Sequence, residues 1–212
     1  MYIYGTESHA RVVREIAEAA GSSVKAVVGE GCDVPAAVKG QPAVVAVPDN
    51  AARRRTVEQL HGPFATVVHP SAVVAPSARI GEGTVVMPGA IVNADAVVGR
   101  HCIIDTGASV DHECHVSDFC HIGPHATLCG AVQVGSGTLV GAAACVIPCI
   151  HIGRDCTIGA GAAVIKNIAD NMKEVGVPAK PLVAAEKAAC GGGKLTLSRV
   201  AVLHGRRTGH AA

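Results

Sequence analysis

The sequence predicts a mainly β protein, a left-handed parallel β-helix of about five coils preceded by a small α/β domain of Rossmann-like βαβαβ order. Three observations carry this prediction. An aliphatic residue recurs at every sixth position from Val68 to Val164 without a break. A small residue, such as Ala72 or Cys120, stands two positions before most of them. Residues 1–68 follow a different pattern, in which short apolar segments alternate with helical ones.

The six-residue period is typical of a hexapeptide β-helix, because a helix repeats roughly every 3.6 residues and a strand every 2. Residues i and i−2 of a strand lie on the same face, so the aliphatic and the small residue both point into the coil. Three hexapeptides close a triangular coil of about 18 residues, whose interior holds three aliphatic and three smaller side chains. No long insertion interrupts the run.

The N-terminal elements follow from short apolar runs and capping residues. We expect strands over residues 2–4, 24–28 and 43–47, and a last strand over 66–68 that leads into the first coil. Ser8 is expected to cap a helix over residues 9–20, and Asp49 or Asn50 a second helix that reaches Leu60. The sequence therefore predicts an α/β domain over residues 1–68 and a β-helix over residues 69–183. Residues 184–212 form a tail that is either flexible or a cloning remnant.

The carboxyl ends of the expected parallel strands form a rim where such sheets bind ligands. Residues 5–9, 29–30 and 48–50 make up this rim. Gly5 follows the first strand, where the lack of a Cβ lets a ligand approach the backbone. The same spacing is equally compatible with a simple turn.

Composition narrows the function classes. The net charge is +1, aromatic residues make up 2% and Trp is absent, which argues against a nucleic-acid binder. No apolar run reaches the length of a membrane span and the start lacks the regions of a signal peptide, so a cytoplasmic protein is expected. Four of the nine cysteines fall at small interior positions, and no C-x-x-C occurs, so we expect structural thiols: Cys102, Cys114, Cys120 and Cys156.

Three of the eleven histidines differ in their position within the repeat. His112 falls at a corner, where Ala94 and Gly130 on the adjacent coils leave a notch around its ring. His115 points outward in a column with Val97, Gln133 and His151. His121 points outward in an apolar column that contains Val85, Ile103 and Leu139, and we expect another subunit to cover this column.

Several motifs resemble one family. Asp105-Thr106-Gly107, His112-Glu113-Cys114 and a second histidine, His121, nine residues on, resemble the hexapeptide acetyltransferases that modify amino sugars on nucleotide carriers. These include the bacillosamine-pathway enzymes and the related sialic acid O-acetyltransferases. The loop Tyr4-Gly5-Thr6-Glu7-Ser8-His9 and the closing Gly176-Val177-Pro178-Ala179-Lys180 also resemble family segments, so the resemblance covers about residues 1–183.

The resemblance implies acetyl-CoA as co-substrate, no metal and a homotrimer. His112 would be the general base, Glu113 or Asp111 would orient its imidazole, and His121 would lie near the thioester. The cofactor would contact His121 and backbone groups at Gly130, Ala142 and Ala160, one of which could serve as an oxyanion donor. The acceptor sugar nucleotide would bind the N-terminal domain through Gly5, Ser8, His9 and Asp49, together with Asp105. Three features depart from the family: Asp105 replaces Asn, the first loop has fewer glycines, and Gly29-Glu30-Gly31 replaces an Asp-rich segment.

The predicted function is acetyl-CoA-dependent N-acetylation of a nucleotide-linked amino sugar, with no nucleic-acid or membrane partner. The alternative is sugar O-acetylation. A zinc enzyme similar to the β-helix carbonic anhydrases is a further alternative, although His121 and His125 do not match its histidine spacing. A non-catalytic scaffold is the last. Because His112 and His121 are half a coil apart, we expect them to meet only between neighbouring subunits.

Overall fold

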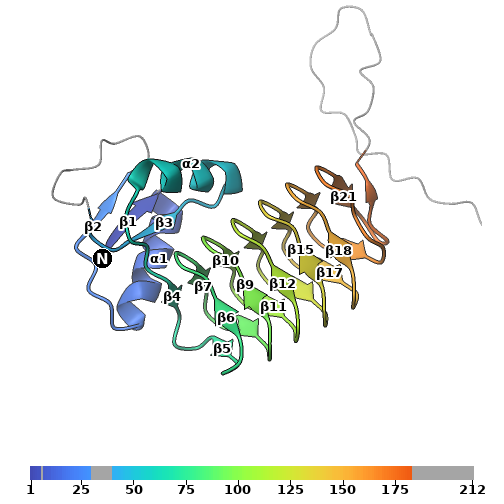
Figure 1. Cartoon of the computed structure of the whole chain (residues 1–212), viewed down its shortest axis with the longest axis horizontal. Helices are drawn as coiled ribbons and strands as arrows, with labels where there is room; N and C mark the ends of the chain where they lie inside the picture. Colours follow the sequence, from blue (N-terminus) through green and yellow to red (C-terminus); the bar gives the residue numbers. More distant parts are fainter. Residues whose placement is uncertain (6, 30–39, 183–212) are drawn as a thin grey trace, which may run out of the picture. The chain divides into compact units, whose positions relative to one another are not determined.

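The computed structural model describes residues 1–5, 7–29 and 40–182, and Met1–Leu182 forms one compact unit (Figure 1). The tail expected over residues 184–212, and the rim residue Glu30, lie outside the described residues. Within the described part, no helix is long and apolar enough to cross a membrane.

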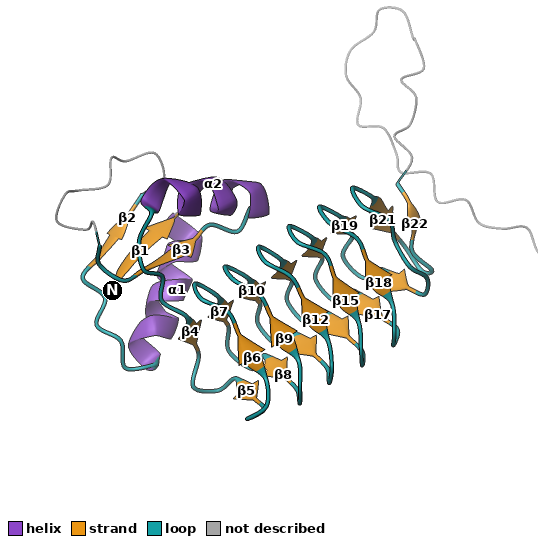
Figure 2. Cartoon of the chain, in the orientation of Figure 1, coloured by secondary structure: helices purple, strands orange, loops and turns teal. Residues whose placement is uncertain are grey.

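The N-terminal region is a three-stranded parallel sheet with the order β2-β1-β3 (Figure 2). Its elements are β1 (Tyr2–Gly5), α1 (Glu7–Ala19), β2 (Ala26–Val28), β3 (Ala43–Ala46) and α2 (Asn50–Leu60). Asp49 caps α2, since its Oδ1 accepts a hydrogen bond from the Ala52 backbone N at 2.7 Å. The cap predicted for the first helix is wrong: α1 already includes Glu7, so Ser8 lies in its first turn.

The repeat folds into a parallel β-helix with three faces. Face I contains β4 (Val67–Val68), β7 (Val85–Val86), β10 (Ile103–Ile104), β13 (His121–Ile122), β16 (Leu139–Val140), β19 (Thr157–Ile158), β21 (Lys173–Val175) and the antiparallel β22 (Lys180–Pro181). Face II contains β5 (Val73–Val74), β8 (Ile91–Val92), β11 (Ser109–Val110), β14 (Thr127–Leu128), β17 (Cys145–Val146) and β20 (Ala163–Val164). Face III contains β6 (Arg79–Ile80), β9 (Val97–Val98), β12 (His115–Val116), β15 (Gln133–Val134) and β18 (His151–Ile152).

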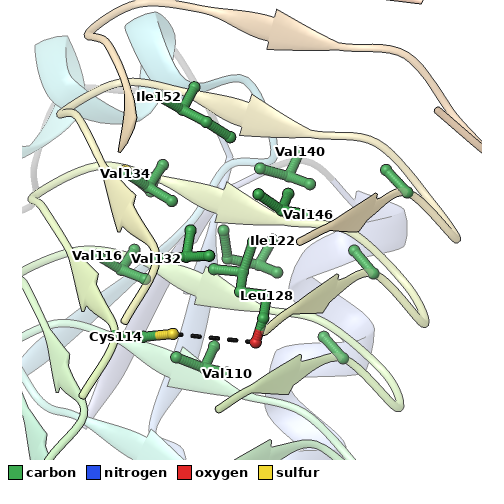
Figure 3. Packing of buried hydrophobic residues seen from close by; sticks show 14 of the residues in the cluster. Val110, Cys114, Val116, Ile122, Leu128, Val132, Val134, Val140, Val146 and Ile152 are labelled. Atoms are coloured by element: carbon green, nitrogen blue, oxygen red, sulfur yellow. Dashed lines mark hydrogen bonds between the residues drawn. The ribbon is translucent and has the colours of Figure 1, made fainter. Parts of the chain in front are cut away.

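The prediction of about five coils is confirmed. Five coils contribute one strand to each face, and a sixth contributes β19, β20 and a single bridge between Ile152 and Ile168. The aliphatic series is buried inside from Val86 onward, as Figure 3 shows for Val116, Ile122 and Leu128, while Val68, Val74 and Ile80 of the first coil are partly buried. Each fully buried Val, Leu or Ile contributes about 1.5–3 kcal/mol relative to an exposed one.

The interior cysteines are structural, as predicted. Thr84, Cys102, Cys120, Thr138 and Cys156 form one column, one residue per coil. Each hydroxyl or thiol donates to the carbonyl oxygen of a later turn, for example Thr138 Oγ1 to Gly153 at 2.8 Å and Cys120 Sγ to Gly135 at 3.2 Å. These contacts give each buried hydroxyl or thiol a hydrogen-bond acceptor inside the coil.

The prediction that another subunit covers the apolar column on face I is wrong. Val85 and Ile103 are each 1% exposed within the single chain, where they pack with Ile3, Val13 and Val44 of the N-terminal domain. The α/β domain buries its own apolar stripe by docking on this face. The domain therefore occupies the surface that the sequence pattern assigns to a second subunit.

The corner between faces III and I carries a buried aromatic stack. His101 is 5% exposed and its ring lies 4.7 Å from that of Phe64 and 5.1 Å from that of Phe119, measured between centroids. Its Nδ1 is buried and has no hydrogen-bond partner among the described residues. Burial lowers the pKa of His101 from 6.5 to about 4.

This pKa shift predicts acid sensitivity. The unfolded chain binds the His101 proton below pH 6.5, whereas the folded chain binds it only below about 4. The stability is therefore fully present above pH 6.5 and falls as the pH drops towards 4, by about 3 kcal/mol in total. Asn tolerates the positive φ of this position, so we expect His101→Asn to reduce the dependence of the free energy of unfolding on pH. Urea unfolding at pH 7.5 and pH 5 measures the free energy of unfolding at each pH. An equal difference between the two pH values in wild type and His101→Asn would contradict the role of His101.

Candidate active site

His112 lies at the corner between faces II and III, directly after β11. A Cβ added to Gly130, one coil further, would lie 2.6 Å from His112 Cε1 and Nε2, so the ring rests on the bare backbone of this glycine. The predicted notch is therefore present. Glycine is required there, because any side chain would displace the imidazole.

Two carboxylates organise the His112 corner in different ways. Glu113 Oε2 lies 3.1 Å from His112 Nδ1, while Asp111 Oδ1 accepts the His112 backbone N at 2.8 Å and Asn93 Nδ2 at 2.8 Å. These hydrogen bonds lower the pKa of Asp111. Glu113 is thus the carboxylate that contacts the imidazole, and Asp111 fixes the turn. Both the His112 and Glu113 side chains are more than half exposed, so the pair is open to solvent.

His121 lies on face I in a more enclosed setting. Its Nε2 is 3.0 Å from Asp105 Oδ2 and its Nδ1 is 3.4 Å from the Pro48 carbonyl oxygen, with side chains of His121 and Asp105 13% and 15% exposed. Burial alone would raise the pKa of Asp105, but hydrogen bonds from His121 and the Thr106 backbone N outweigh it and lower the pKa. Asp105 is therefore a carboxylate at neutral pH.

The carboxyl ends of β1 and β3 meet beside this pair. A Cβ at Gly5 would lie 2.1 Å from the Ala46 carbonyl oxygen, which explains the glycine. His9, in the first turn of α1, has a buried Nε2 without a hydrogen-bond partner among the described residues, and burial lowers its pKa. The nearby His121 lowers the pKa of His9 further, while Asp105 opposes this shift. The rim predicted from strand ends therefore faces His121, while Ser8 is exposed.

A cleft of about 420 Å³ continues from this rim under the N-terminus of α2. Pro48 and Asp49 line one side, and Leu139, which pairs with His121 in the next coil, lines the other. Arg54 and Arg55 of α2 also contribute. These arginines cannot be recognised as site residues from the sequence, because an arginine run on a short polar helix carries no spacing signal.

The predicted site residues gather in three places within one chain. Gly130 shares the corner of His112 between faces II and III. Ala142 and Ala160 lie at the corner between faces I and II, where the Gly161 backbone N donates to the Ala142 carbonyl. His121 lies on face I, with Asp105 and the rim. His115 points outward from face III in register with Val97 and Gln133, as predicted.

The described residues contain no group of three or more His, Cys, Asp or Glu arranged to hold a metal ion. The exposed His112–Glu113 pair can move a proton, and the His121–Asp105 pair can orient a polar ligand at the rim. The fold is that of a hexapeptide-repeat β-helix with an N-terminal α/β region.

Comparison with known proteins extends this assignment. No protein-family model and no curated protein matches the chain significantly. Several solved structures do match the chain. A mutant of perosamine N-acetyltransferase from Caulobacter crescentus, in complex with CoA and GDP-perosamine, is 34% identical, with 86% of this chain and 97% of that chain covered and a TM-score of 0.80. The protein PerB from the same organism, also with CoA and GDP-perosamine, is 37% identical, with coverage of 86% and 96% and a TM-score of 0.79.

The acetyltransferase domain of PglB from Neisseria gonorrhoeae is 34% identical, with coverage of 85% and 98% and a TM-score of 0.77. The chain therefore belongs to the family of hexapeptide-type β-helix acetyltransferases. The resemblance drawn from its motifs is confirmed.

Proposed function

We propose that this protein transfers the acetyl group of acetyl-CoA to the amino group of a nucleotide-linked amino sugar. The observation that carries the proposal is the exposed His112–Glu113 pair, set on a Gly130 notch, in a chain that matches enzymes with this activity over nearly their full length. The predicted acyltransferase activity and the use of CoA as co-substrate agree with these relatives.

In the proposed reaction, His112 takes a proton from the acceptor amine as its nitrogen attacks the thioester carbonyl of acetyl-CoA. The carbon–nitrogen bond forms, and the tetrahedral intermediate then expels the CoA thiolate, which receives the proton from the imidazolium. Glu113, 3.1 Å from Nδ1, stabilises the imidazolium while the proton is held. A backbone amide near Gly130, Ala142 or Ala160 would stabilise the oxyanion.

The acceptor would bind at the rim formed by Gly5, His9 and Asp49, with Asp105 and His121 below it. Support comes from the switch point between β1 and β3, where parallel sheets bind their ligands, and from the unpartnered His9 Nε2. Ser8, in the first turn of α1, is exposed and open to the same ligand. Because nucleotide sugars and acetyl-CoA are cytoplasmic metabolites, this activity implies a cytoplasmic location.

We also propose a homotrimer in which face II forms the subunit contact. The first three strands of face I pack against the N-terminal domain, and face III presents the polar residues His115, Gln133 and His151. Face II and the corner beside it expose large apolar side chains at both ends, namely Val73 (62%), Ile91 (36%), Ile147 (40%) and Ile165 (53%). A partner on this face would bury the flank of His112 and bring its own face I residues towards it.

A substrate panel tests the proposal. Purified protein is incubated with acetyl-CoA and UDP-, GDP- or dTDP-linked amino sugars, and products are identified by mass spectrometry. We expect a gain of one acetyl group that resists mild alkaline hydroxylamine, as an amide does. A labile product would favour the sugar O-acetyltransferase alternative. Absence of any acetylated product across the panel would contradict the proposed activity.

Native mass spectrometry of the same sample tests the proposed trimer.

A further inference from the structure

Arg53, in the first turns of α2, is almost completely buried, with 1% of its surface exposed. Its Nε donates to the His101 carbonyl at 2.7 Å, and its Nη1 to the carbonyls of Val47 at 2.8 Å and Pro48 at 3.2 Å. Its Nη2 donates to the carbonyls of Phe119 at 3.0 Å and Cys120 at 3.2 Å, and to Asn50 Oδ1 at 2.6 Å. No carboxylate forms a salt bridge with Arg53 among the described residues.

Asn50 extends the same contact by one coil, because its Nδ2 donates to the Gly137 carbonyl at 2.8 Å. His101, Phe119 and Gly137 occupy the same corner position in three successive coils, and each has a positive φ. The start of α2 is therefore held to three coils through carbonyl oxygens of the corner between faces III and I. These contacts fix the helix both along and across the β-helix.

A guanidinium suits this position for a geometric reason. It presents five N–H donors in a planar fork, whereas an ammonium has three donors on a flexible stem. A buried charge without a counter-ion is unfavourable unless its hydrogen bonds are complete, and here every nitrogen has an acceptor. Burial lowers the pKa of Arg53 to about 10, so the side chain stays charged at neutral pH. An apolar residue would leave five carbonyl oxygens without this donor.

The Arg53 contacts reach the candidate site through one shared atom. The Pro48 carbonyl oxygen that accepts from Arg53 Nη1 also lies 3.4 Å from His121 Nδ1. Pro48 precedes Asp49, so the backbone that carries the rim is fixed between the guanidinium and His121. A shift of α2 along the corner would move the rim relative to the His121–Asp105 pair.

We propose that Arg53, assisted by Asn50, is a positioning residue that sets the acceptor-binding rim at a fixed distance from His121 and Asp105. The inference rests on the proposed function and adds to it the group that aligns the acceptor. Arg53 itself touches neither substrate. Its effect should therefore fall on the acceptor and spare acetyl-CoA, which is expected to lie along later coils.

Steady-state kinetics of Arg53→Lys, Arg53→Ala and Asn50→Ala test this role with an acceptor that the wild-type protein has been shown to use. We expect Arg53→Lys to lower kcat/KM for the acceptor by roughly 10- to 100-fold, since a misplacement of about 1 Å can cost that much. KM for acetyl-CoA should stay within about twofold of wild type, because the later coils are unchanged. Arg14→Lys, an exposed arginine on α1 paired with Glu18, is the matched control and should match wild type.

Chemical rescue separates positioning from general stability. Methylguanidinium should restore part of the acceptor kcat/KM of Arg53→Ala, and methylammonium at the same concentration should not. If Arg53→Ala does not fold, Arg53→Lys alone decides the question. Wild-type acceptor kinetics in folded Arg53→Lys, or equal losses for acceptor and acetyl-CoA without rescue, would overturn the inference. An inactive wild-type protein would instead refute the proposed function, so the two failures are distinguishable.

Discussion

His112→Ala is expected to lower kcat by roughly 10²–10⁴, because a positioned general base contributes a factor of this size. The side chain is more than half exposed and rests on Gly130, so its removal leaves no buried cavity and the protein should stay folded. Thiol release from acetyl-CoA in the presence of the accepted amino sugar measures kcat, and thermal unfolding checks the fold.

The matched control for His112→Ala is His115→Ala, an exposed histidine three residues further along the chain on face III. It should keep wild-type activity, since its exposed side chain lies on face III and not at the corner. Gly130→Ala should resemble His112→Ala, because the added Cβ would meet the imidazole. A His112→Ala protein that keeps more than about a third of wild-type kcat would show that another group is the base.

Mixing two inactive variants is expected to restore activity if the active site is shared between subunits. His112 lies at the corner between faces II and III and His121 on face I, so one chain presents them on different sides. In mixed trimers of His112→Ala and His121→Ala, about a quarter of the interfaces would combine an intact His112 with an intact His121. We therefore expect about a quarter of wild-type activity after the subunits have been unfolded and refolded together.

The starting point for this mixing experiment is a separate assay in which His121→Ala is shown to be inactive. Each variant refolded alone supplies the background rate. Native mass spectrometry, with a mass tag on one variant, verifies that mixed trimers have formed. Verified mixed trimers that are no more active than the parents would mean that each chain carries its own complete site.

Much of this protein can be predicted from local pattern. The period of six determines which side chains point inward, because alternation along a strand is a property of neighbouring residues. It therefore predicted the coils, the interior thiols, the corner position of His112 and the notch at Gly130. The cap of α2 was narrowed to Asp49 or Asn50 in the same way, since capping involves residues within one turn, and the structure has Asp49. The family could also be recognised from the sequence, because its motif lies within the short segment from Asp105 to His121.

Only the tertiary structure decided what lies against the outward-facing residues. The pattern shows that Val85 and Ile103 point out of the β-helix, but their cover comes from Ile3, Val13 and Val44, far away in the chain. Likewise, the contact between His121 and the Pro48 carbonyl joins residues 73 positions apart, and that between Arg53 and Cys120 joins residues 67 apart. Periodicity encodes the direction of a side chain, whereas the partner it meets depends on contacts between segments far apart in the chain, which no local spacing records.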